Sequence, residues 1–210
     1  MHDATTSVNR SALVIATDGS HHLLNGNPAY PERFLKVFGF YEGLAAVQTA
    51  DGWLHIQSDG KAAYHSRFDW VGNWQQSRCV VRDFDGHYLH IQRDGSPAYD
   101  ERYIYAGDFR DGAAFVQRGD GLATHIDVDG CLLHGRWFLE LDVFHKGFAR
   151  ARDAGGWHHI NRAGEAAYSA RFEAVDAFYN GQAWVKSATG DERIISERGE
   201  TIRQIHRDTV

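Results

Sequence analysis

The sequence predicts an all-β protein built from six copies of one unit, and three observations lead to this prediction. A segment of 34 or 35 residues recurs along the chain. One glycine recurs at a fixed place in each copy, at Gly26, Gly60, Gly95, Gly130, Gly164 and Gly199. Short runs rich in aromatic and β-branched residues alternate with glycine turns, without helical periodicity. A fixed period of this size is typical of propellers, solenoids and arrays, in which one unit cannot bury its apolar face alone.

The copies are similar enough to be aligned almost without gaps. Four of them read GLAAVQTADGWLHIQSDGKAAYHSRF, SRCVVRDFDGHYLHIQRDGSPAYDERY, GAAFVQRGDGLATHIDVDGCLLHGRW and GFARARDAGGWHHINRAGEAAYSARF. We expect one domain over residues 1–210, with approximate units 12–43, 44–77, 78–112, 113–147, 148–181 and 182–210. An arginine followed by an aromatic residue marks five of the units, at Arg33, Arg67, Arg102, Arg136 and Arg171. We predict that these arginines are architectural, with each guanidinium bonded to backbone or acidic groups between units.

Each unit is expected to contain about four short strands. In the second unit the runs are residues 44–48, residues 53–57, a short run that ends at Tyr64, and residues 67–74. Asp51-Gly52 and Asp59-Gly60 separate the first three runs. Asp-Gly between apolar runs favours a hairpin, because glycine accepts the positive φ of a tight turn and aspartate can bond the turn backbone. The repeated Asp59, Asp94 and Asp129 are therefore interpreted as turn residues.

Two arrangements of such units remain open. A radial arrangement gives a small closed six-bladed β-propeller, whereas a linear one gives an open β-solenoid that needs capping units. The last copy ends with residues 201–207 and lacks the arginine-aromatic strand, while about ten residues precede the first strand at Ala12. We expect closure, with the N-terminal segment completing the last blade, and keep a frayed cap as the alternative.

Composition excludes several classes of function. The formal charge is −6 and the basic residues are dispersed, so we expect no nucleic-acid partner. The two cysteines occupy non-equivalent positions, which predicts neither a disulfide framework nor a zinc site and favours a cytoplasmic setting. The apolar stretch from Ala12 to Ala16 is too short for a membrane span or a signal-peptide core. We therefore expect no membrane partner.

Histidines recur at one position of the repeat, at His55, His90, His125 and His159. A closed ring would bring them together, where they could hold a metal or an anion. A residue required in every copy is first explained by the shared fold, because an imidazole can bond a neighbouring strand or the repeated arginine. We predict the structural role, with no metal and no cofactor. The adjacent pair His21-His22 is a poor start for a metal site, because neighbouring side chains diverge on a strand.

A basic cluster is the first candidate ligand site. His145, Lys146, Arg150 and Arg152 lie near the junction of the fourth and fifth units, and the two arginines share one face of a strand. Eight steps separate Arg136 from Phe144, against seven from Arg67 to Trp74, which suggests a bulge of the kind found beside sites. These side chains could hold an acidic ligand. The alternative is a solvent face on which Glu140 and Asp142 pair with the arginines.

Aromatic residues are the second candidate site. Phe, Tyr and Trp make up 13% of the chain, and Trp53, Trp70, Trp157, Trp184 and Tyr88 are not uniform across the copies. Exposed indoles on a rigid β scaffold suit sugar stacking or a protein hot spot, so Trp53 and Trp157 are predicted ligand-binding residues. The alternative is that these rings pack in the core.

The repeat resembles the bacterial WG (or KWG) repeat. The motif runs from Phe40 to Val47 and continues as Gly52-Trp53-Leu54-His55-Ile56; it returns from Phe144 to Gly147 and continues from Gly156 to Ile160. The resemblance covers residues 12–207, although only two copies keep tryptophan beside the turn. It implies a binding or scaffolding role, often as an accessory domain beside an enzyme such as a methyltransferase, and no catalytic residue.

The sequence favours a non-catalytic module that recognises a protein partner, or the substrate of an enzyme with which it works or to which it is fused. No G-x-S-x-G, phosphate loop, G-x-G-x-x-G or H-E-x-x-H motif occurs, so no catalytic residue is predicted. One alternative is a glycan-binding, lectin-like domain that uses the tryptophans. Another is a hydrolase with its site at the fourth-to-fifth junction, where Glu140 and Asp142 supply paired carboxylates.

Overall fold

The computed structural model describes residues 13–205, which form six antiparallel β-sheets and contain no helix. The first three sheets comprise β1 (Val14–Ile15), β2 (His22–Leu24) and β3 (Asn27–Pro28); β4 (Lys36–Tyr41), β5 (Leu44–Thr49) and β6 (Gly52–Ile56); and β7 (Trp70–Gln75), β8 (Arg78–Arg82) and β9 (Tyr88–Ile91). The last three comprise β10 (Tyr105–Ala106), β11 (Ala114–Gln117) and β12 (Ala123–Ile126); β13 (Glu140–Leu141), β14 (Phe148–Asp153) and β15 (Gly156–Asn161); and β16 (Ala174–Val175), β17 (Gln182–Lys186), β18 (Glu192–Ser196) and β19 (Thr201–Ile205). The all-β prediction is confirmed.

Each sheet is a meander in which strands adjacent in sequence pair with one another. From the second sheet onward, the first strand of a sheet comes from the end of one sequence unit, and the next two come from the unit that follows. Lys36 of β4, for example, pairs with Gln48 of β5, across the unit boundary at residue 44. This offset ties consecutive units together through backbone hydrogen bonds.

The fourth run of each predicted unit divides between two sheets. After β6, the chain returns along its free edge, where Ala62 bridges Ile56 and Phe68 bridges Trp53. Trp70 then begins the next sheet by pairing with Arg82. The expected continuous strand over residues 67–74 is therefore wrong, because Phe68 belongs to one sheet and Trp70 to the next.

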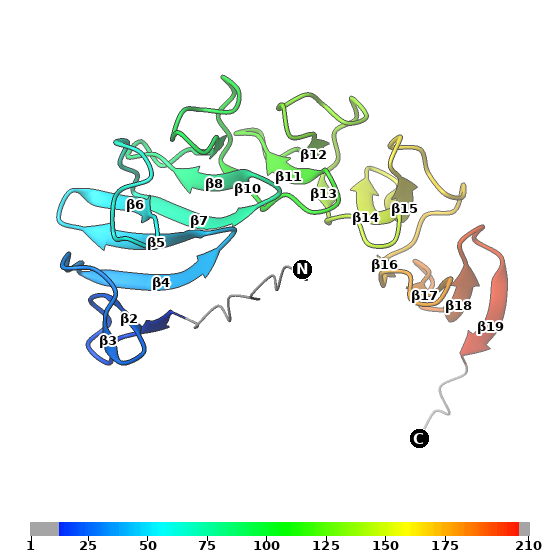
Figure 1. Ribbon diagram of the computed structural model, residues 1–210. Coiled ribbons are helices and arrows are strands. Elements are labelled where there is room, and N and C mark those ends of the chain that lie inside the picture. The colour runs from blue at the N-terminus through cyan, green and yellow to red at the C-terminus, as the bar shows by residue number, and fades with distance from the viewer. Residues whose placement is uncertain (1–12, 206–210) are drawn as a thin grey trace, which may run out of the picture.

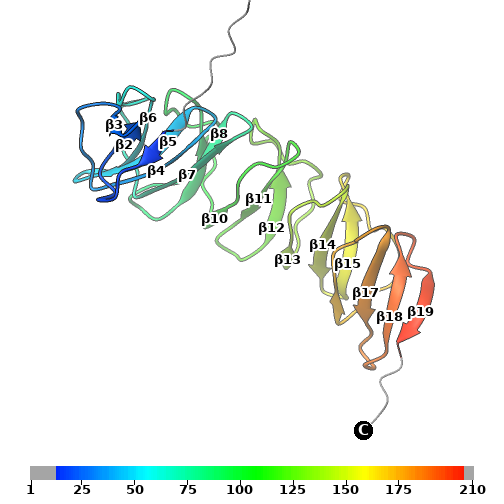
Figure 2. The ribbon, with the colours of Figure 1, turned by 60° about the horizontal axis from the view of Figure 1, so that its bottom comes forward.

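The six sheets follow one another in an open, curved row, not in a closed ring (Figure 1). In Figure 1 the first strands β10, β13 and β16 lie along the inner side of the curve, and Figure 2 shows the row stepping from the blue end to the red end. Among the described residues no strand of the first sheet pairs with the last, which already has its fourth strand in β19. The expected closure is thus corrected to the open alternative. Residues 1–12, to which the closing strand was assigned, lie outside the described residues.

Apolar side chains fill the joints between successive sheets. A single buried cluster joins the second and third sheets, together with Tyr30 after β3, and includes Val37, Val47, Leu54 and Val71. Separate clusters fill the joints farther along the row. Because each sheet covers its neighbour, a unit buries its apolar surface only when another unit stands beside it.

Candidate functional site

The repeated histidines form the polar part of each joint. The His55 Nε2 lies 3.0 Å from the Gly72 carbonyl oxygen in the next sheet, and its Nδ1 lies 2.6 Å from the Tyr64 hydroxyl. A carbonyl only accepts, so Nε2 carries the proton and the Tyr64 hydroxyl donates to Nδ1. The same arrangement links His22 to Tyr30 and Phe38, His90 to Tyr99 and Gly107, and His159 to Tyr168 and Asp176.

The joint varies once. His125 Nε2 donates to the Asp142 carbonyl as expected, but its Nδ1 is 3.1 Å from Nε2 of His134, which stands where the other copies have tyrosine. Burial lowers the pKa of His55, His90, His125 and His159 to about 4, because the charged imidazolium loses its hydration. These histidines are therefore neutral near pH 7, and each has both nitrogens occupied by protein partners.

The structural role predicted for the histidines is thus borne out by their contacts, with a correction of the partner. They bond the neighbouring strand and a tyrosine, and not the repeated arginine. The tyrosines were missed, although their spacing of nine residues from His55, His90 and His159 was visible in the sequence. His22, first considered only with His21, is a member of the same series.

Four of the five repeated arginines, namely Arg33, Arg67, Arg102 and Arg171, bond backbone within their own unit. Arg102 Nη1 donates to the carbonyls of residues 99–101, at 2.8 to 3.3 Å, and Arg33 does the same to residues 30–32. Arg67 and Arg171 each donate to the carbonyls of the two preceding residues in the same way. The prediction of bonds between units is wrong, because the preceding loop curls around the guanidinium before the chain reaches the next sheet.

The turn aspartates follow two patterns. Asp59 and Asp94 accept from the backbone N–H two residues later, as predicted. In the fourth unit Asp127 takes this role, accepting from Asp129 and Cys131, while Asp129 forms an ion pair with Arg78. All three aspartates therefore lie in the turn as predicted, but in the fourth unit Asp127 accepts from the turn backbone in place of Asp129.

The four residues of the predicted basic cluster do not form one site. Arg150 and Arg152 lie on one face of β14, but Arg150 pairs with Asp142 and Arg152 with Glu140. His145 and Lys146 lie in the turn before β14, and the Lys146 ammonium is 5.4 Å from the Tyr179 ring centroid. The geometry thus matches the alternative, in which carboxylates pair with the two arginines.

The extra residue near this cluster has a different origin from the one predicted. The ladder shifts by one residue between Leu141–Ala151 and His145–Phe148, yet the same shift occurs in the second sheet between Val37 and Phe40. The bulge therefore belongs to the repeat. Phe138 bridges Ala123 as Phe68 bridges Trp53, so Trp137 occupies the place of Arg67. Arg136 stands one residue earlier than that position, and this is why eight steps separate it from Phe144 where seven separate Arg67 from Trp74.

Aromatic rings line one face of the first joints. We define the aromatic strip as Phe38, Trp53, Trp70, Tyr88, Tyr105 and Phe115. Ring centroids are 5.7 Å apart for Phe38 and Trp53, 6.3 Å for Trp70 and Tyr88, 5.5 Å for Tyr88 and Tyr105, and 5.7 Å for Tyr105 and Phe115. Trp53 and Trp70 line one small pocket, which links the rings of the second sheet with those of the third. Phe38 is 38% exposed, Trp70 39% and Tyr105 47%, so the strip is open to solvent.

The same face carries charge at the other end of the row. Trp70 and Tyr105 are the first residues of β7 and β10, whereas the first residue of β13 is Glu140. Phe115 pairs with His125 across its hairpin, and the residue that pairs with His159 is Arg150. Aromatic residues at these positions are consequently not required by the repeat itself.

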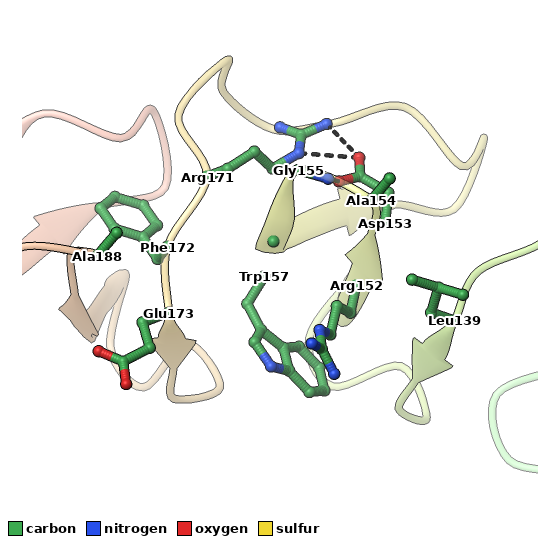
Figure 3. A pocket seen from close by; sticks show the side chains of 11 residues that line it. Leu139, Arg152, Asp153, Ala154, Gly155, Trp157, Arg171, Phe172, Glu173 and Ala188 are labelled. Atoms are coloured by element: carbon green, nitrogen blue, oxygen red, sulfur yellow. Dashed lines mark hydrogen bonds and ion pairs between the residues drawn. The ribbon is translucent and has the colours of Figure 1, made fainter.

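A pocket of about 350 Å³ lies between the fifth and sixth sheets (Figure 3). Trp157 and Arg152 come from β15 and β14, while Glu173 directly precedes β16 and Ala188 follows β17, both strands of the sixth sheet. Of the predicted ligand residues, the structure brings Arg152 and Trp157 together here and places Trp53 in the aromatic strip. The other lining residues were missed, since their approach depends on how two sheets pack.

Three further features of the described residues concern metal ions, membrane spans and thiols. Between residues 13 and 205, no three His, Cys, Asp or Glu side chains are grouped to hold a metal ion. The same part of the chain has no helix that is long and apolar enough to span a membrane. Cys79 is buried, Cys131 is exposed, and both are free thiols.

Comparison with known proteins gives structural likenesses only. No protein-family model matches the chain, and no curated protein does. BamB from Moraxella catarrhalis is similar with a TM-score of 0.45 and 13% identity, over 89% of this chain and 66% of that chain. The computationally designed Ika8 protein gives 0.48 and 16%, over 90% and 69%. The WD40 β-propeller domain of Doa1 gives 0.37 and 13%, over 92% and 71%. TM-scores below 0.5 do not establish a shared fold.

Proposed function

We propose that this chain is a non-catalytic binding module of the WG-repeat type that holds a protein partner on its aromatic strip. The observation that carries the proposal is the solvent-open row of rings from Phe38 to Phe115, which spans three sheets and the two joints between them. Aromatic side chains offer large contact area with little loss of rotamer entropy, and they dominate protein-binding hot spots.

The difference between the two ends of the row supports this role. Where the first joints carry the aromatic strip, the fifth sheet carries the Arg150–Asp142 and Arg152–Glu140 pairs. The fold therefore tolerates charged residues at positions where the strip exposes apolar area. A soluble protein gains nothing in stability from an exposed ring that a charged residue can replace, so an interaction is the better reason for the strip.

The WG-type assignment has support in the geometry of two turns. Gly52 and Gly156, each followed by tryptophan, have φ of 129° and 126°. A Cβ at Gly52 would stand 2.8 Å from the Phe68 carbonyl oxygen, and one at Gly156 would stand 2.7 Å from that of Phe172. The glycine of the Gly-Trp pair is thus needed in these two units, where the hairpin closes against the returning edge. Two free thiols support a reducing, cytoplasmic setting, with the module working beside or fused to an enzyme.

The test starts from crosslinking in cells. A photoreactive phenylalanine analogue replaces Tyr105 in the strip or, as the matched control, Ala174, which begins β16 as Tyr105 begins β10. The protein captured from position 105 is purified, and its Kd is measured with the wild-type chain and with W70A, Y105A and E140A. We expect W70A and Y105A to weaken binding by about 30-fold each, the size of a hot-spot loss, and E140A to leave it unchanged. Equal capture at both positions, or equal Kd values, would overturn the proposal.

A further inference from the structure

The pocket between the fifth and sixth sheets exists because one loop residue is small. The connections at residues 83–87 and 187–191 are equivalent, and their second residues are Phe84 and Ala188. At the joint between the second and third sheets the Phe84 ring stands over the hairpin, since its Cζ is 3.0 Å from the place of a Cβ on Gly52. At the later joint Ala188 leaves the space beside Gly155 and Gly156 open.

The open space has an aromatic wall. Trp157 lies beside the hairpin glycines and is partly exposed, and Figure 3 shows its indole between Arg152 and Glu173. Gly155 and Gly156 have no side chains, so backbone lies at the surface beside the ring. A flat ligand with an apolar face can therefore approach the indole.

The polar groups around the indole are balanced in charge. Arg171 bonds Asp153, with Nε to Oδ2 at 2.9 Å, at the other end of the pocket (Figure 3). This bond lowers the pKa of Asp153, which keeps the carboxylate charged. Lys186 pairs with Glu173 at 2.9 Å, outside the lining. Two cations and two anions line the pocket, so its net charge is zero.

Donors and acceptors nevertheless remain available. Among the described residues, Arg152 uses only Nη1, which donates to Glu140, although a guanidinium has five N–H donors. The side chains of Arg152 and Glu173 are 46% and 53% exposed, on either side of the indole. The pocket thus offers planar donors and a carboxylate acceptor around an aromatic face.

We propose that this pocket binds a neutral carbohydrate, with one sugar ring stacked on Trp157 and its hydroxyl groups bonded to Arg152 and Glu173. A sugar combines an apolar C–H face with a rim of hydroxyls that both donate and accept, which matches an indole flanked by a guanidinium and a carboxylate. The volume of about 350 Å³ is in the range of small-molecule sites, about 300–1,000 Å³. The proposal is independent of the protein contact on the aromatic strip.

Other ligand classes fit less well. An acidic ligand would gain no net attraction, because the charges of Asp153 and Glu173 offset those of the two arginines. A purely apolar ligand would bury four charged groups without hydrogen bonds. A neutral polyhydroxylated ring needs no such attraction and avoids that cost.

The test follows the indole N–H signals by NMR while glucose, galactose, mannose and N-acetylglucosamine are added to the full chain, with glucuronate as the charged probe. We expect at least one neutral sugar to shift the Trp157 signal, identified with W157F, without shifting that of Trp53. A188F, which copies the residue the chain already has at Phe84, is expected to abolish the shift. W157A is expected to weaken binding, measured by calorimetry, by about tenfold, as loss of one aromatic contact would.

F84A is the matched control, because it changes the equivalent loop at a joint outside the pocket and should leave sugar binding unchanged. The proposal is overturned if no neutral sugar moves the Trp157 signal, if A188F binds as the wild type does, or if glucuronate binds more tightly than glucose.

Discussion

Gly95 lies directly against the ring of Tyr64, so that a Cβ on Gly95 would stand 2.6 Å from the Tyr64 Cγ. The same tyrosine donates its hydroxyl proton to His55. The turn of the third unit thus packs on the tyrosine that bonds the histidine of the second unit. The relationship recurs for Gly60 on Tyr30, Gly130 on Tyr99, Gly164 on His134 and Gly199 on Tyr168. The repeated glycine is therefore needed for close approach as well as for its positive φ.

Substitution of Gly95 tests this close approach. G95A adds a methyl group where the Tyr64 ring already lies, so we expect the free energy of unfolding to fall by about 1–3 kcal/mol beyond the cost of the backbone conformation. Gly86 is the matched control, because its φ of 86° is close to the 81° of Gly95 but nothing lies within 4 Å of a Cβ there. Urea denaturation of both variants gives the comparison. Equal losses for G95A and G86A would show that only φ matters.

Removal of one tyrosine hydroxyl tests the histidine joint. In Y64F the buried Nδ1 of His55 loses its donor, and an unsatisfied buried group costs about 1–3 kcal/mol of folding free energy. Y41F removes a hydroxyl from an exposed ring and should change little. The midpoints of urea denaturation are compared at pH 7.5. If Y64F is as stable as Y41F, the hydrogen bond does not hold the joint.

The buried histidines predict a loss of stability in mild acid. In the unfolded chain an imidazole titrates near pH 6.5, whereas burial holds the pKa of His55, His90, His125 and His159 at about 4. Because the unfolded state binds protons first, stability is fully present above pH 6.5 and falls as the pH approaches 4. Each histidine contributes about 1.4 kcal/mol per pH unit in that window.

Urea denaturation at pH 7.5, 6.5, 5.5 and 5.0 measures this dependence. H65Q, which removes an exposed histidine, is expected to keep the same slope. A denaturation midpoint that stays constant from pH 7.5 to 5.0 is incompatible with the neutral buried histidines.

Truncation of a repeated arginine should cost less than the sequence alone suggests. Bonds between units predict a loss of about 1–3 kcal/mol on truncation. Arg102 instead bonds exposed carbonyls of its own loop, so we expect R102A to lose only about 0.5–1 kcal/mol. R171A should lose more, since Asp153 is then left without its partner. Thermal unfolding ranks the stabilities of the variants. If R102A loses as much stability as Y64F, the arginine does hold neighbouring units together, as the sequence alone suggested.

Features confined to one unit could be predicted from sequence, and features that depend on two sheets could not. Period, hairpin turns and strand composition are local, so the all-β repeat was evident. The small rotation between successive sheets decides between a ring and an open row, and it arises from packing of side chains such as Val37 and Val71. No sequence pattern reports that rotation.

The candidate sites follow the same division. Alternation correctly placed Arg150 and Arg152 on one face, and spacing correctly placed the histidines at equivalent positions. The pocket depends on Ala188 of one unit meeting Trp157 of another, and the aromatic strip depends on rings from three successive sheets. Those contacts exist only after the sheets stack.

The affinity of the partner captured through position 105 is the measurement that tests the central claim most directly. The strip is proposed as the contact surface, so the double variant W70A/Y105A should lose at least about 30-fold in Kd, the loss expected from a hot spot. The control E140A/R152A changes the equivalent face of the fifth sheet and should bind as the wild type does. A double strip variant that folds and keeps the wild-type Kd, or a control that loses as much, would contradict the assignment.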